Sequence, residues 1–112
     1  MNAIVKTHGR RIGTWALGLL AALACLGTTG CGGALYAITA SSASSKLETA
    51  RALGAERYAP YEYWYANEHL WKAMEEASSA EYGDALNLAD TAEEYADKAV
   101  TLSRQAHEGA GR

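Results

Sequence analysis

The residues best suited to chemistry are three histidines, but their spacing is not that of a zinc site on a helix. They are His8, His69 and His107. A zinc site on a helix needs two histidines four residues apart on one face, whereas His69 has only Glu68 beside it. His69 is therefore expected to be an ordinary surface residue.

An acidic stretch supplies the candidates for acid–base chemistry. It contains Glu62, Glu68, Glu75 and Glu76. Because no pair of these carboxylates has apolar neighbours that would bury it, a solvated helix face explains them better than a catalytic pair. The sequence also contains no G-x-S-x-G motif and no phosphate-binding loop. We therefore expect a protein that is not an enzyme, binds no metal or other cofactor and has no small-molecule substrate.

The two cysteines, Cys25 and Cys31, lie near the end of a segment with the order of a secretory signal peptide. Residues 1–11 are short and positively charged, and an apolar block runs from Ile12 to Leu26. That block has the length of a signal-peptide core and is short for a membrane span. Small residues then lead to Cys31. The sequence therefore predicts an exported protein.

The sequence GTTGC, which ends at Cys31, resembles the lipobox of bacterial lipoproteins. In that motif the cysteine thiol receives a diacylglyceryl group and the cysteine becomes the new N-terminus. The resemblance implies that Cys31 is the lipid attachment site. It also implies an outer-membrane location facing the periplasm, because Gly32 stands where an Asp tends to retain a lipoprotein in the inner membrane. Two or three acyl chains form a stable anchor where one chain does not.

Three other interpretations stay open. Cys25, at the end of the sequence ALAC, also satisfies a loose lipobox. The apolar segment could instead be kept as a transmembrane helix through Ile38, which would give a single-pass inner-membrane protein. The two cysteines could also form a disulfide. We prefer lipid attachment at Cys31 because it follows the small residues, whereas Cys25 belongs to the apolar block.

After Cys31 the composition favours an all-α fold. Alanine is abundant, phenylalanine is absent and Pro60 is the only proline. A helical hairpin or three-helix bundle is expected behind the N-terminal signal or anchor helix. The predicted division is a signal peptide over 1–30, a tether over 31–44, the helical hairpin or bundle over 45–108 and a frayed C-terminus over 109–112.

The expected first helix begins at Ser45, which forms a capping box with Glu48, and runs to about Tyr58. Gly54 weakens it by about 1 kcal/mol relative to alanine. Pro60 then begins a second helix, because proline suits the first helical turn and disfavours α conformation in the residue before it.

A second capping box, Ser78 with Glu81, predicts the start of a third helix, which Gly109 ends. Each of the three helices has a stripe of apolar residues at helical spacing, which predicts its buried face. The stripes are Ala43, Leu47, Ala50 and Leu53; Tyr63, Ala66, Leu70, Ala73 or Met74, and Ala77; and Tyr82, Ala85, Leu88 or Ala89, Ala92, Ala96, Ala99 and Leu102.

The aromatic run YEYWY, residues 61–65, cannot be buried as a whole, because five consecutive residues point all around a helix. Tyrosine and tryptophan are enriched where proteins bind one another. We therefore consider Tyr61, Trp64, Tyr65 and Trp71 as a possible partner-binding patch. Partial exposure without a partner and contact with a membrane interface are the alternatives.

Residues 50–99 resemble a family of small alanine-rich helical bacterial lipoproteins that has no established activity. Members carry a YAP motif, an acidic or aromatic pair, spaced alanines and a tyrosine. The matching residues are Tyr58, Ala59, Pro60, Glu62, Ala66, Leu70, Ala73, Tyr82, Ala85 and Ala92. The resemblance implies an α-hairpin exposed in the cell envelope, sometimes fused to a peptidoglycan-binding domain. Residues 80–99 also look like half of a tetratricopeptide repeat.

The excess of acidic residues after Cys31 argues against a nucleic acid as the partner. From Cys31 onward the chain has 7 basic and 13 acidic residues, and nucleic-acid binding needs clustered lysine and arginine. The expected function is that of a lipid-anchored structural or adaptor module that binds another envelope protein or itself. A cell-wall-associated binding module and a single-pass inner-membrane protein are the alternatives.

Overall fold

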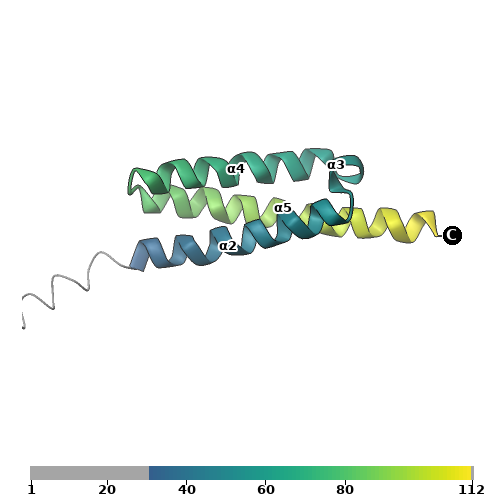
Figure 1. Ribbon diagram of the computed structural model, residues 1–112, viewed down its shortest axis with the longest axis horizontal. Helices are drawn as coiled ribbons and strands as arrows, with labels where there is room; N and C mark the ends of the chain where they lie inside the picture. The colour runs from purple at the N-terminus through teal and green to yellow at the C-terminus, as the bar shows by residue number, and fades with distance from the viewer. Residues whose placement is uncertain (1–30, 112) are drawn as a thin grey trace, which may run out of the picture. The chain divides into compact units, whose positions relative to one another are not determined.

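The computed structural model describes residues 31–111, and these form an all-helical unit with no strand in that range (Figure 1). The predicted signal peptide, residues 1–30, and Cys25 lie outside the described residues. The helices are α2 (Cys31–Ala52), α3 (Ala55–Tyr58), α4 (Pro60–Ser78) and α5 (Tyr82–Ala110). The prediction of an all-α fold is therefore confirmed for this part of the chain.

The first helix begins much earlier than its capping box predicts. Residues 31–44, predicted to be a tether, are helical instead and belong to the 22-residue α2, and Ser45 lies within that helix. Tertiary contact explains the difference. A Cβ added to Gly32 would lie 3.3 Å from the Cβ of Tyr82 on α5, and Ala43 is fully buried. Packing against α5 therefore outweighs the low helix propensity of the glycines.

Gly54 divides the predicted first helix in two. Its φ is 76°, in the left-handed region that glycine adopts without strain, and it separates α2 from the single turn of α3. The chain turns again at Ala59, whose φ of −144° is non-helical, as expected for a residue before proline. The prediction that Pro60 begins a helix is confirmed.

The turn between α4 and α5 does not use the predicted capping box. Ser78 is still the last residue of α4, and its hydroxyl donates to the carbonyl of Glu75 at 2.6 Å. Glu81 is instead the residue that precedes α5. Ala80 carries the reversal with a positive φ of 62°. The capping-box prediction is therefore wrong, because Ser78 ends one helix and does not start the next.

Helices α4 and α5 form a hairpin, and α2 runs beside α5 in the same direction (Figure 1). Contacts at both ends show this direction. Gly32 at the start of α2 lies against Tyr82 at the start of α5. At the other end, Nε2 of His107 is 2.9 Å from the carbonyl oxygen of Leu53 and donates to it. This bond supplies a donor for a carbonyl at the end of α2.

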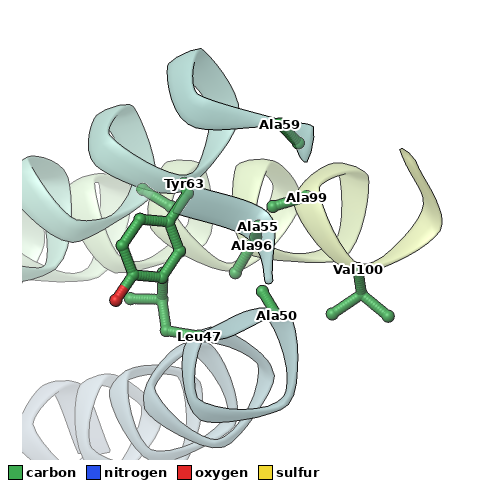
Figure 2. Packing of buried hydrophobic residues seen from close by; sticks show 9 residues of the cluster. Leu47, Ala50, Ala55, Ala59, Tyr63, Ala96, Ala99 and Val100 are labelled. Atoms are coloured by element: carbon green, nitrogen blue, oxygen red, sulfur yellow. The ribbon is translucent and has the colours of Figure 1, made fainter. Parts of the chain in front are cut away.

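The core of the bundle consists mainly of alanine. Figure 2 shows Tyr63, Leu47 and Val100 as the larger side chains among these small ones. Small side chains let helix backbones approach closely, so close packing between the helices stabilises the bundle. The buried residues are Ala43, Leu47, Ala50, Ala55, Ala59, Tyr63, Ala66, Ala73, Ala85, Ala89, Ala92, Ala96, Ala99, Val100 and Ser103.

The predicted stripes contain most of these buried residues, but some of their large side chains are exposed. Met74 is 53% exposed, while its alternative Ala73 is buried. Tyr82 and Leu102 are exposed at the two ends of the third stripe. Leu70 is partly buried and packs against the core.

A polar cluster also joins α2 to α5. The carboxylate of Glu93 accepts a hydrogen bond from Ser42 at 2.7 Å and another from Lys46 at 3.0 Å. Lys46 also lies 3.6 Å from Asp97. The hydrogen bonds from Ser42 and Lys46 lower the pKa of Glu93, and the bond to Glu93 raises the pKa of Lys46. The cluster thus stabilises the charged forms of both groups.

Candidate protein-binding surface

The largest side chains of α4 lie on its outer surface rather than in the core. Trp71 is 69% exposed, Tyr61 62% and Trp64 51%. Tyr65 is partly buried. Three of the four residues predicted to form a binding patch are therefore well exposed, while most buried residues are alanines.

The tyrosines belong to a cluster that spans α4 and α5. The ring centroid of Tyr65 lies 5.5 Å from that of Tyr61 and 4.3 Å from that of Tyr95 on α5. His69 stacks on Tyr65 at 4.1 Å. Its Nδ1 lies 2.9 Å from the carbonyl oxygen of Tyr65, so that nitrogen carries the proton and donates. These contacts hold the rings in place one helical turn after Pro60.

Tyr95 is a member of this cluster that sequence reasoning missed. Its ring lies 6.3 Å from that of Tyr61, and Nζ of Lys98 sits 4.3 Å from the ring centroid. Lys98 also donates to Glu94 at 2.7 Å, and this hydrogen bond raises the pKa of Lys98. The alignment of α4 against α5 decides which side chains meet, and a single sequence does not give that alignment.

The tryptophans line two hollows in the surface. Trp64 lines the first with Tyr61, Tyr65 and Glu68, and Pro60 and His69 complete its described lining. Among the described residues, Trp71, Met74 and Glu75 line the second. Each hollow thus has an indole wall and one carboxylate, and neither has a lysine or arginine among its described lining residues.

Trp64 and Trp71 therefore belong to a short repeat along α4. Each tryptophan has a glutamate four residues later, Glu68 and Glu75, and the two pairs are seven residues apart. Residues four apart lie on the same side of a helix. Tyr63 packs edge-on against Trp64 with ring centroids 5.1 Å apart, so the first indole is supported by a core residue.

Cys31, the predicted lipid attachment site, is the first residue of α2 and is exposed with a free thiol. Leu35 and Ile38, within the next two turns, are each more than half exposed. Two exposed apolar side chains therefore lie on α2 close to the cysteine. No helix in residues 31–111 combines the length and apolar character needed to cross a membrane.

The histidines form no metal site in the described part of the chain. His69 and His107 are on different helices, and one ring nitrogen of each is hydrogen-bonded to a backbone carbonyl oxygen. No group of three or more histidine, cysteine, aspartate or glutamate side chains in residues 31–111 is placed to hold a metal ion.

Comparison with known protein families shows that most of the chain matches one family. Residues 39–110 match the family described as a domain of unknown function, DUF4398. The match covers nearly all of the described helices. Searches of the curated proteins and of the solved structures give no match. The likeness to a tetratricopeptide repeat and the membership of a lipoprotein family stay predictions.

Proposed function

The chain belongs to the family of the domain of unknown function DUF4398, and from its geometry we propose that it is a lipid-anchored adaptor of the cell envelope. In this proposal Cys31 carries the lipid, and the aromatic surface of α4 binds another protein. That surface consists of Tyr61, Trp64, Tyr65 and Trp71. The contrast between an alanine core and exposed tryptophans is the observation that carries the binding role.

Exposed aromatic area of this kind is costly in water. A tryptophan that is 69% exposed, as Trp71 is, places a large apolar surface in solvent. The buried positions are occupied mostly by alanine, and both described tryptophans lie outside them. Exposed apolar patches typically mark sites where a partner binds. Tyrosine and tryptophan also supply most of the binding energy at many protein interfaces.

The part of the aromatic surface next to Pro60, which contains Tyr61, Trp64 and Tyr65, is placed to bind a protein rather than the membrane itself. Helix α2, whose first residue is Cys31, begins at the end of the bundle where α5 begins, since Gly32 lies against Tyr82, whereas α4 begins at the opposite end (Figure 1). Tyr61, Trp64 and Tyr65 follow Pro60 within about one turn. A lipid on Cys31 would thus place these rings away from the bilayer, while Leu35 and Ile38 would lie next to it.

The anchor is tested by labelling cells with radioactive palmitate. The wild-type chain is expected to take up label, and Cys31→Ser is expected to lose it. The control is Cys25→Ser, which is expected to keep the label. Continued labelling of the Cys31→Ser variant would exclude Cys31 as the attachment site. The intact mass of the purified protein is expected to match residues 31–112 plus acyl chains.

The binding role is tested by photo-crosslinking in cells. A photoreactive amino acid is placed at Tyr61 or at Trp71, and at Glu94 on the exposed side of α5 as the control. We expect a discrete crosslinked product from the first two positions and none from Glu94. Equal crosslinking from all three positions, or none from any, would remove the support for an adaptor.

A further inference from the structure

We propose that the repeated tryptophan–glutamate pairs of α4 bind a partner helix through two cationic side chains, preferably arginines, seven residues apart. This inference rests on the proposed adaptor function and adds the chemistry of its partner. The first pair is Trp64 with Glu68 and the second is Trp71 with Glu75, and each pair lines its own hollow.

The composition of each hollow indicates a cation. An indole face attracts a cation through its ring electrons, and tryptophan is the strongest of the aromatic residues in this respect. A carboxylate on the adjacent turn adds an ion pair and accepts hydrogen bonds. Arginine suits both groups, because its planar guanidinium stacks on an aromatic ring and binds a carboxylate through two parallel bonds.

Within residues 31–111, neither Glu68 nor Glu75 forms an ion pair. The described ion pairs use other acidic residues, namely Glu56, Glu93, Glu94 and Asp97. Glu68 and Glu75 are both exposed on α4. The chain from Cys31 onward carries 13 acidic and 7 basic residues, so the surrounding field also attracts a positive partner.

The spacing of the two pairs identifies the conformation of the partner. Seven residues of an α-helix span about 10.5 Å and return to nearly the same face. A partner helix with cations seven residues apart matches this distance and direction. An extended strand does not, because residues on one of its faces recur at about 6.7 and 13 Å.

A second copy of this chain does not supply such a pair. The basic residues of the described helices are Lys46, Arg51, Arg57, Lys72, Lys98 and Arg104, and no two of them are seven apart. Two copies of α4 packed together would also bring Glu68 and Glu75 of one near the same residues of the other. Like charges placed opposite each other disfavour such a dimer. The inferred occupant is therefore a different protein.

The test measures binding of designed helical peptides to the full-length chain in detergent micelles. Two peptides have the same composition, with arginines seven apart in one and five apart in the other, so that only the first presents both on one face. Tryptophan fluorescence reports the titration at physiological salt. We expect the first peptide to bind at least about fivefold more tightly.

Variants of the chain then identify the groups responsible. Glu68→Gln with Glu75→Gln is expected to weaken binding of the first peptide about tenfold. The matched control, Glu48→Gln with Glu108→Gln, removes the same charge from exposed positions elsewhere and is expected to change binding less than twofold. Trp71→Ala is expected to weaken binding about 30-fold, as for a typical hot-spot aromatic. Circular dichroism checks that each variant stays folded.

Four results would overturn this inference. The first is equal affinity for the two peptides, and the second is an equal loss in both glutamine variants, since each would indicate general charge attraction. The third is tight binding of a peptide covering residues 1–11, whose Lys6, Arg10 and Arg11 would make the chain its own ligand. Persistent crosslinking from Tyr61 in cells, without binding of the arginine peptide, would reject the cationic helix and leave the adaptor function standing.

Discussion

Replacing Ala43 by leucine should destabilise the bundle, whereas the same change at Ala37 should not. Ala43 is fully buried in α2, and Ala37, on the same helix, is exposed. A leucine at position 43 forces a branched side chain into a contact between closely packed helices. Overpacking of this kind costs about 1–3 kcal/mol. An exposed alanine on a helix accepts leucine within about 0.5 kcal/mol.

The size of the effect is measurable for a bundle of this length. About 1 kcal/mol shifts the melting temperature of a small domain by roughly 4–8 °C. Ala43→Leu is therefore expected to lower the melting temperature by about 5–20 °C. The assay is thermal unfolding followed by circular dichroism at the helical band, with Ala37→Leu in the same detergent. Equal melting temperatures for the two variants would show that residues 31–44 do not pack as described.

Three further outcomes follow from single contacts. Gly54→Ala should cost about 1 kcal/mol or more, because alanine is strained at a φ of 76° and its Cβ would meet the Tyr58 ring at 3.3 Å; urea titration checks this. Ser103→Ala should stabilise the bundle by about 1 kcal/mol, because the buried hydroxyl has no hydrogen-bond partner within residues 31–111; a lower urea midpoint would contradict it. Because its pKa is lowered from the ordinary 4.5, ionised Glu93 stabilises the fold above pH 4.5, and this contribution is lost as the pH falls through the folded pKa. The melting temperature of Glu93→Gln should therefore depend less on pH in that acidic range.

The sequence was informative where local pattern and packing agree. The spacing of alanines such as Ala66 and Ala92 follows the helical period, and both are buried. Pro60 marks a boundary through its own geometry and begins α4. These features depend on the residues themselves, so a single sequence reveals them.

The errors occurred where distant contacts decide the outcome. Gly32 and Gly33 have low helix propensity, yet both lie against Tyr82, which is about fifty residues away in the chain. Tyr95 joins Tyr65 for the same reason. Each tryptophan–glutamate pair was present in the sequence, but its members were interpreted separately, as an aromatic patch and as a solvated acidic face. The hollows of the surface bring them together.

The start of α2 at Cys31 has a consequence for the reach of the protein. A flexible tether of fourteen residues would let the bundle wander over roughly 20 Å from its point of attachment. If Cys31 is acylated as proposed, a helix that begins at this residue leaves no flexible segment between the lipid and the bundle. The 22 residues of α2 instead form a rigid spacer about 33 Å long. Only partners that present their binding helix within that height above the bilayer could contact the aromatic surface. The length of α2, together with the charge of the partner helix, would therefore determine which partners bind.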